Sequence, residues 1–390
     1  MNPKNTSPFF SILLPTKNRS HLVGYAIRSV LQQDFTNFEL IICDNDDDPD
    51  ATRRVVKQYS DQRIKYIRTG GLDMIANWNT ALNAATGQHV IVLEDKMIFY
   101  AGALAAIKQI IEVSPSGIVV WKTDIIEDEG EIPVLIHQHV AEDELLTSEV
   151  VLKKVVTNVM FNWAILPRGL CCSVPKATID AIMLKTGNPF YEEISPDFVS
   201  AIKLLWYIDN YIMSGNTFNL ITSNKVSNGK NVLFRKFKDF DYFMGNKKFQ
   251  LNLENVYVKS QWIVANLVIA DYLNQRSHLG GKLERFRVSN RNYFEMLFQE
   301  LLVTSIHEKK ILWNKEEIWQ LFSGGDGWIA NGKYGISFIT GLLMNKLLKY
   351  KRRTRGNVLK LPISTESLKF VEEYLNGTAM IKGRKAFASC

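Results

Sequence analysis

Cysteine is scarce in this sequence. The 390-residue chain has four cysteines and no C-x-x-C pair: Cys43, Cys171, Cys172 and Cys390. Their number and spacing exclude a disulfide framework of the kind that holds small secreted domains together. We therefore expect reduced and partly buried thiols.

Long apolar runs are also missing. No stretch approaches the roughly 18 consecutive apolar residues that a membrane-spanning helix needs. The first ten residues, MNPKNTSPFF, lack the apolar segment of a signal peptide. Both absences predict a cytosolic chain.

The common glycine-rich nucleotide motifs are absent as well. The first predicted strand is followed by P-T-K-N-R-S, not by G-x-G-x-x-G, and no G-x-x-x-x-G-K-[ST] motif occurs. A dehydrogenase-type site and a P-loop are therefore excluded, because both need a backbone that closely surrounds phosphate groups. Any nucleotide must instead be held by side chains and by acids at strand ends.

Composition and charge bound the architecture. The chain is 46% hydrophobic and 22% charged, which is ordinary for a globular protein. Its length suggests two domains, or one large domain with an appendage. Residues 1–225 carry 20 Lys and Arg against 26 Asp and Glu, whereas residues 226–390 carry 27 against 14. The acidic first part and the basic second part suggest different roles.

Apolar runs and amphipathic stretches alternate in the first hundred residues. Short apolar runs predict strands at Phe9–Leu14, Phe38–Cys43, Ile64–Ile67 and His89–Leu93. Between them we predict helices over 21–33, over about 50–60, and around Trp78, with Ser20 as the cap of the first. This βαβαβαβ order predicts an α/β fold with a mostly parallel sheet flanked by helices and joined by right-handed crossovers.

Polar residues follow the predicted strands where they end. His89–Leu93 runs into Glu94, Asp95 and Lys96, and Phe38–Cys43 runs into Asp44, Asn45 and three further aspartates. Ligands of open α/β sheets bind beyond the carboxyl ends of the strands, so these residues are the first candidates for chemistry. The alternative is a solvated strand-end turn, and plain solvation is the expectation for 46–48. For Trp78 we expect packing on a helix face.

The middle of the chain offers weaker signals. Strands are predicted at Ile118–Trp121 and Ile132–Ile136, on either side of an acidic turn over 124–131. His137 and His139 alternate beside Glu142 and Asp143, which makes a metal site conceivable. Two exposed histidines on a strand are the commoner arrangement, and we expect that here.

A second functional centre is predicted at Glu192–Asp197. Ser195 can cap a helix, Pro196 suits its first turn, and Asp197 follows directly. Backbone N–H groups at a helix start stabilise a carboxylate, which would keep Asp197 deprotonated as a general base must be. The alternative is an ordinary acid in a first helical turn.

The basic second half is predicted to be mainly helical from Asn231 onward. An amphipathic helix over 336–350 runs into the basic cluster 351–355. This combination is typical of contact with an anionic membrane surface. The alternative is a helix packed on the domain with a solvated run of charges.

The first hundred residues resemble a known family. The stretch SILLPTKNRSHLVGYAIRSVLQQDFTNFELIICDND is similar to the N-terminus of inverting glycosyltransferases of family two, which have the GT-A fold. The resemblance is close over about 10–104 and looser up to about 229. It implies a GT-A glycosyltransferase domain over 1–230, with a donor half at about 8–122 and an acceptor half at about 123–230. Residues 231–390 would then be a basic, mainly helical C-terminal region.

The resemblance also assigns roles to residues. It implies a nucleotide-diphosphate sugar as the donor, with a UDP-sugar as the first choice. Asp197 would be the general base that activates the acceptor, with Glu192 and Glu193 as second choices. The residues implied in donor binding are Pro15, Thr16, Asn18, Arg19, Asp44, Asn45, Asn79, Glu94, Asp95 and Lys96.

The chain departs from the family pattern at the metal site. The family has D-x-D or D-D-D after the fourth strand, and its last acid binds Mg²⁺ or Mn²⁺, but this chain has Glu94, Asp95, Lys96 and Met97. Hard cations prefer oxygen ligands, and neither a lysine nor a methionine supplies one. Three alternatives follow: a metal held by Asp95 alone, Lys96 as a cation in place of the metal, or an inactive protein.

The resemblance implies an inverting glycosyltransferase in the synthesis of bacterial surface polysaccharide or another glycan. The acceptor would be a glycan or a lipid-linked sugar, and no nucleic-acid partner is expected. The protein would be cytoplasmic and peripheral to the membrane through 336–355. Two rivals are a nucleotidyltransferase, which would begin with a glycine-rich basic loop, and a non-catalytic sugar-nucleotide-binding or scaffold protein.

Overall fold

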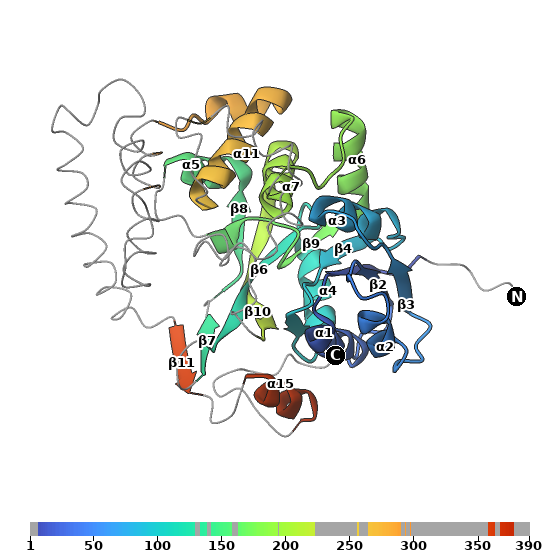
Figure 1. Cartoon of the computed structure of the whole chain (residues 1–390). Helices are drawn as coiled ribbons and strands as arrows, with labels where there is room; N and C mark the ends of the chain where they lie inside the picture. Colours follow the sequence, from blue (N-terminus) through green and yellow to red (C-terminus); the bar gives the residue numbers. More distant parts are fainter. Residues whose placement is uncertain are drawn as a thin grey trace, which may run out of the picture.

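The computed structural model describes most of residues 7–222 and parts of the remainder of the chain (Figure 1). The described residues are 7–128, 133–138, 142–157, 163–193, 195–222, 256, 264–289, 293, 297, 358–362 and 367–377. The predicted helix over 336–350 and the basic cluster 351–355 lie outside these residues, so the membrane contact through them stays a prediction. No helix in the described ranges is both long and apolar enough to cross a bilayer.

The first part of the chain has the predicted βαβαβαβ order. The four strands β4-β1-β2-β3 lie side by side and are parallel. β1 and β2 are buried along their whole length, as expected for strands covered by helices on both faces. The elements are β1 (Phe10–Thr16), α1 (Ser20–Leu31), β2 (Phe38–Asp44), α2 (Ala51–Val56), β3 (Ile64–Arg68), α3 (Met74–Asn83) and β4 (His89–Val92).

The remainder of the sheet is mixed, so the prediction of a mostly parallel sheet holds only for the first four strands. β9 (Cys172–Pro175) and β6 (Val119–Glu127) extend the sheet antiparallel to their neighbours. β7 (Val134–Gln138) follows β6 after six residues, which is too short for a crossover and imposes an antiparallel pair. β10 (Asn210–Ile221) is parallel to β6 and antiparallel to β5 (Met97–Phe99) and β8 (Glu144–Thr147).

Two apolar clusters cover the two faces of the sheet. Alternate residues of β1 divide between them: Ile12 and Leu14 pack with α1 and α4 (Ala103–Val113), whereas Leu13 packs in the cluster that includes α3. The α3 cluster also contains residues of α5 (Ser148–Thr157), α6 (Lys176–Thr186) and α7 (Pro196–Tyr207). The class predicted from the sequence, a sheet flanked by helices, is therefore confirmed.

Two local predictions are corrected. Ser20 is the first residue of α1 and does not cap it, since the cap position is Arg19 and carries no side-chain hydrogen bond. Asp124 lies inside β6 and not in an acidic turn, because β6 continues to Glu127.

Described elements of the C-terminal region pack onto the first domain. α11 (Val264–Leu279) lies alongside α7, and its Val268 and Tyr272 belong to the same buried cluster as Leu204 and Leu205 (Figure 1). β11 (Val358–Pro362) pairs with β7, and α15 (Ser367–Leu375) contacts α1. The predicted boundary near 230 falls outside the described residues and stays a prediction.

Gly87 allows β1 and the start of β4 to approach closely. A Cβ atom at this position would lie 2.8 Å from the Ser11 nitrogen and 2.9 Å from the Phe10 carbonyl carbon. Gly87→Ala should therefore lower the free energy of unfolding by about 1–3 kcal/mol, because backbone atoms must move. Urea denaturation would measure this loss.

The control is Gly24→Ala in α1. Its nearest neighbour would be the Val55 side chain at 3.2 Å, and alanine has a better helix propensity than glycine. This variant should be close to neutral. Equal stability of Gly87→Ala and the wild type would contradict the proposed close approach.

Candidate functional site

The loops after β1 and β4 are joined by Asp95. The Thr16 hydroxyl and the Arg19 guanidinium donate to its two oxygens over 2.9 Å and 3.0 Å. Asp95 is 3% exposed, so both contacts are shielded from water. The structure thus brings together three of the residues implied in donor binding, although Asp95 is 79 positions from Thr16 and 76 from Arg19.

The loops after β1 and β2 are joined in the same way. The Asn18 side chain donates to Asp47 over 2.7 Å and accepts from the Asp47 backbone over 2.9 Å, with Asn18 at φ 55°. Asp46 is buried and accepts from Thr52, and burial raises the pKa of Asp46. The expected solvation of 46–48 is wrong for Asp46 and correct for Asp47 and Asp48, which are largely exposed.

Asp44 does not face solvent. Its carboxylate is fully buried and accepts hydrogen bonds from the Tyr66 hydroxyl, the Arg68 guanidinium and the Asp46 backbone N–H. Burial and the neighbouring carboxylate raise the pKa of Tyr66, so its hydroxyl remains a donor. The resemblance implies Asp44 in donor binding, but β3 places Tyr66 and Arg68 across its carboxylate.

Two of the predicted asparagines bind backbone groups. Asn45 accepts from the Leu72 N–H over 3.0 Å and donates to the Leu72 carbonyl over 2.7 Å. Asn79 donates to the Tyr191 carbonyl over 2.7 Å, which connects α3 to the segment before α7. Trp78 is buried and packs edge-on against Tyr191, as expected for a residue on a helix face.

Lys96 is buried beside Glu94. Its ammonium lies 3.2 Å from Glu94 Oε2, and its backbone carbonyl accepts from Thr222. Lys96 is 5% exposed, while the Glu94 side chain is 23% exposed. The strand end therefore carries two cation–carboxylate pairs, Arg19–Asp95 and Lys96–Glu94.

These residues do not fit a divalent cation. Each oxygen of Asp95 already accepts a hydrogen bond, from Thr16 or from Arg19, and Glu94 faces an ammonium group. Within the described ranges, no three His, Cys, Asp or Glu side chains are grouped so that they could hold a metal ion. A hard cation needs several free oxygens, which this donor set does not supply.

The predicted base lies in the first turn of α7. Ser195 is the cap residue, Pro196 begins the helix, and Arg168 is 3.3 Å from Asp197 Oδ2. Burial raises the pKa of Asp197; Arg168 opposes this effect and Glu94 adds to it. The helix start was expected to keep Asp197 ionised, and backbone N–H groups there do lower its pKa, although burial acts in the opposite direction.

Arg168 was missed in the sequence. Leu170 bridges to Val92, so the segment that carries Arg168 lies beside the end of β4. Its guanidinium stacks on Phe198 at 5.2 Å, and its Nε is buried without a hydrogen-bond partner in the described part of the chain. A single arginine inside the apolar stretch Leu166–Val174 was the signal that could have identified it.

The second choices for the base have other roles. Glu192 forms an ion pair with the buried Lys203 over 2.7 Å and accepts from Gln275 over 2.9 Å. Glu193 has a positive φ of 62°, which is uncommon for a residue with a side chain. Glu192 is thus a structural anchor, and Asp197 is the better candidate.

Of the two alternating histidines, the structure describes His137. His137 is buried, and its Nδ1 lies 2.7 Å from Asp124, which also accepts from the Tyr100 hydroxyl. Asp143 accepts from the backbone of Gly215, and His139 lies outside the described residues. The expectation of an exposed His137 is corrected, because β6 and β7 place it against a buried carboxylate.

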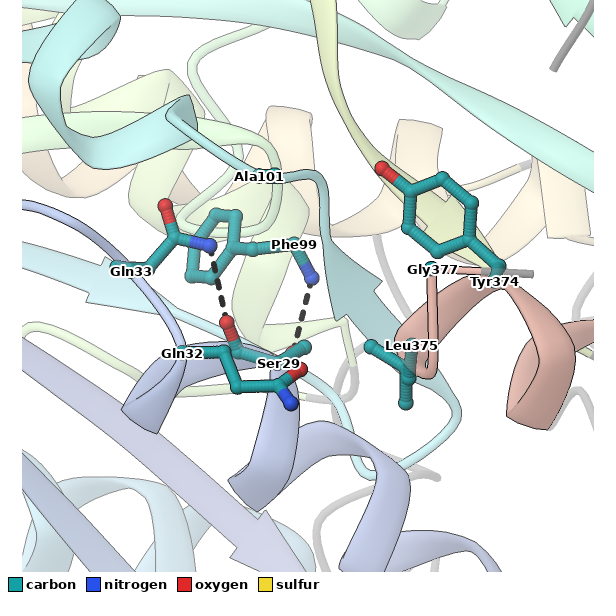
Figure 2. A pocket seen from close by; sticks show the side chains of 8 residues that line it. All are labelled: Ser29, Gln32, Gln33, Phe99, Ala101, Tyr374, Leu375 and Gly377. Atoms are coloured by element: carbon teal, nitrogen blue, oxygen red, sulfur yellow. Dashed lines mark hydrogen bonds between the residues drawn. The ribbon is translucent and has the colours of Figure 1, made fainter. Parts of the chain in front are cut away.

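A cavity of about 520 Å³ lies away from these strand ends, between α1, β5 and α15 (Figure 2). Ser29 accepts from the Phe99 N–H, and Gln33 donates to the Ser29 carbonyl. Its polar groups therefore serve packing, and it adds nothing to the candidate site. Its lining residues are Ser29, Gln32, Gln33, Phe99, Ala101, Tyr374, Leu375 and Gly377.

Comparisons with known proteins agree with this geometry. Residues 11–169 match the family described as glycosyl transferase family 2. The Escherichia coli UDP-Glc:alpha-D-GlcNAc-diphosphoundecaprenol beta-1,3-glucosyltransferase WfgD is 39% identical over 95 residues, which are 24% of this chain and 37% of that protein. The Campylobacter jejuni GalNAc(5)-diNAcBac-PP-undecaprenol beta-1,3-glucosyltransferase is 34% identical over 129 residues, 32% of this chain and 41% of that protein.

The chain spans less than half the length of these two curated relatives. Among solved structures, Staphylococcus aureus TarS 1–349 in complex with UDP-GlcNAc aligns with a TM-score of 0.49 at 14% identity, over 81% of this chain and 79% of that chain. The family match covers the strand ends after β1, β2 and β4 and the segment that carries Arg168. Residues 11–169 of this chain therefore match glycosyl transferase family 2.

Proposed function

We propose that this protein transfers a sugar from a nucleotide-diphosphate sugar to an acceptor hydroxyl with inversion. One observation carries the proposal: Arg168 lies 3.3 Å from Asp197, and the segment that carries Arg168 bridges through Leu170 to Val92 at the end of β4. This geometry supports one site built from two centres that are about a hundred residues apart in the sequence. Such a site has a base and cations, which are groups that glycosyl transfer requires.

The donor would bind across the ends of β1, β2 and β4. One side of the donor site would be the loop after β1, with Pro15, Thr16, Asn18 and Arg19. Thr16 and Arg19 bind Asp95, and Asn18 binds Asp47, which fixes the shape of this loop. Asp44 would contribute to recognition of the nucleotide base indirectly, because its hydrogen bonds position Tyr66 and Arg68. Asn45 and Asn79 would keep the surrounding loops in place.

The chemical step is a single displacement. Asp197 accepts the proton of the acceptor hydroxyl, whose oxygen then forms a bond to the anomeric carbon. The bond between that carbon and the diphosphate oxygen breaks, and the nucleoside diphosphate leaves with the electron pair. Attack from the side opposite to the leaving group inverts the anomeric centre, and Lys96 would offset charge on the leaving diphosphate.

The relatives support a choice of substrates. The name of the Escherichia coli relative specifies UDP-Glc as donor, and both curated names specify a diphosphoundecaprenol-linked acceptor and a β-1,3 linkage. We therefore propose a UDP-hexose as donor, a lipid-linked glycan as acceptor, and a role in bacterial polysaccharide synthesis.

Thermal stability with added nucleotides tests the donor assignment. A ligand at about 100 times its dissociation constant stabilises the native state by roughly 2.7 kcal/mol. UDP and UDP-glucose should therefore raise the melting temperature, whereas adenosine should not.

A variant separates site binding from nonspecific protection. Thr16→Val, which loses the hydroxyl that donates to Asp95, should reduce the shift caused by UDP, while Thr80→Val on α3 should not. If no nucleoside diphosphate or nucleotide sugar alters the melting temperature, the proposed function is wrong. Binding of UDP-sugars without transfer to any acceptor would favour the non-catalytic alternative.

A further inference from the structure

We propose that α11, from the C-terminal region, positions the catalytic base through Asp271 and Gln275. The inference rests on the proposed function, since it assigns positioning residues to the reaction in which Asp197 is the base. Both residues are buried, and both reach across to the segment that directly precedes α7.

Asp271 binds the backbone of Ser195, the residue at the N-cap of α7. Its Oδ2 accepts from the Ser195 backbone N–H over 3.1 Å, two residues before Asp197. The Ser195 side chain makes no capping hydrogen bond to α7, while its carbonyl accepts from Val199. An N–H group at the start of a helix has no partner inside the helix, so Asp271 supplies the acceptor from another element.

Gln275 lies one helical turn further along α11 and donates a hydrogen bond to Glu192. Glu192 Oε1 accepts from Gln275 over 2.9 Å and pairs with Lys203 over 2.7 Å. Lys203 is fully buried on α7 and also donates to the Pro189 carbonyl over 2.6 Å. The segment before the base is therefore held from α7 and α11 together.

These contacts contribute little net stability to the fold, which favours a role in positioning Asp197. A buried ion pair such as Lys203–Glu192 gives little net stability compared with apolar packing, because both charges lose their hydration. Glu193 adopts a left-handed conformation beside it, which persists only where the surroundings impose it. Burial also raises the pKa of Asp271, although hydrogen bonds from Ser195 oppose this. The fold thus maintains strain and buried charge next to Asp197.

The test combines amide hydrogen exchange with kinetics in the full-length chain. Asp271→Leu removes the acceptor at similar size, and we expect peptides that cover 189–199 to exchange about tenfold faster. Turnover of UDP-glucose with acceptor should fall by a similar factor, while affinity for UDP stays unchanged. Asp271→Asn retains an acceptor oxygen and should restore both properties.

Tyr272→Phe is the matched control. It removes a hydrogen bond from the same helix to the Phe286 carbonyl, at a buried position. It should leave exchange of 189–199 and turnover unchanged. Where Asp271→Leu fails to fold, Gln275→Ala takes its place with the same expectations.

Two results would overturn the proposal. One is unchanged exchange of 189–199 in folded Asp271→Leu and Gln275→Ala; the other is an equal effect of Tyr272→Phe. If the wild type shows no transfer with any UDP-sugar, the proposed function fails. The exchange measurements then still decide whether α11 holds this segment.

Discussion

Asp197→Asn should reduce sugar transfer by roughly 10²–10⁴-fold, the range expected for loss of a general base. Asparagine keeps the shape of the side chain at the start of α7 but cannot accept a proton from the acceptor hydroxyl. UDP affinity, measured by calorimetry, should be nearly unchanged, because Asp197 takes a proton from the acceptor substrate and does not bind the nucleotide.

Asp180→Asn is the control for this substitution. Asp180 pairs with Lys176 on the exposed side of α6, so its loss should change neither transfer nor UDP affinity. Full transfer activity in Asp197→Asn would remove Asp197 from the mechanism. Glu94 would then be the next carboxylate to test, because it is partly exposed at the end of β4.

The pH dependence of transfer follows from the surroundings of Asp197. Burial raises the pKa of Asp197 above its ordinary value of 3.8, Arg168 opposes this, and Glu94 adds to it. Asp271 on α11 is a further nearby carboxyl group that is electrostatically linked to Asp197. Since the base must be ionised, activity should rise with pH through this raised pKa, and Arg168→Gln should move the midpoint to higher pH.

The same pKa determines the sign of the effect on stability. A carboxyl group with a raised folded-state pKa stabilises the fold when it is protonated, below its unfolded-state pKa. That contribution is lost as the pH rises through the folded-state value. Above this raised pKa the ionised Asp197 therefore costs stability, and Asp197→Asn should not lower the melting temperature there.

The parallel half of the fold and the strand-end contacts were predictable because they follow from local pattern. Short apolar runs identify β1, β2 and β4, and parallel strands place their carboxyl ends at one edge of the sheet. Thr16, Arg19 and Asp95 meet there, as expected. The antiparallel half is harder to predict, since the pairing of β10 with β6 spans about ninety residues and has no local signal.

The burial and hydrogen-bond partners of individual carboxylates could not be predicted, because the partners come from other helices and strands. Asp44 and Asp46 occur in one acidic run, yet Asp44 is enclosed by Tyr66 and Arg68 from β3 and Asp46 by Thr52 from α2. The contact of Asp271 with Ser195 joins residues 76 positions apart. Sequence identifies the acids, whereas packing decides which of them are available to a ligand.

Lys96→Met should weaken UDP-sugar binding about 10–100-fold, the effect of losing one hydrogen bond to a charged group worth about 1.5–3 kcal/mol. Methionine keeps the length of the buried stem but removes the ammonium that pairs with Glu94. Transfer should fall at least as much as affinity, because charge on the diphosphate increases as the bond to the sugar breaks. Calorimetry with UDP and a transfer assay at saturating UDP-glucose would measure the two effects.

A transfer assay in excess chelator distinguishes the Lys96 ammonium from a divalent metal ion as the positive charge at the end of β4. Each oxygen of Asp95 already accepts a hydrogen bond, from Thr16 or from Arg19, so we expect the wild type to retain its transfer activity in chelator. Lys96→Asp adds a third carboxylate at this strand end and should become inactive or dependent on Mg²⁺ or Mn²⁺. Lys176→Met, at a surface pair on α6, should behave as the wild type. Loss of wild-type transfer in chelator, reversed by Mn²⁺, would show that a metal acts here and that Lys96 does not replace it.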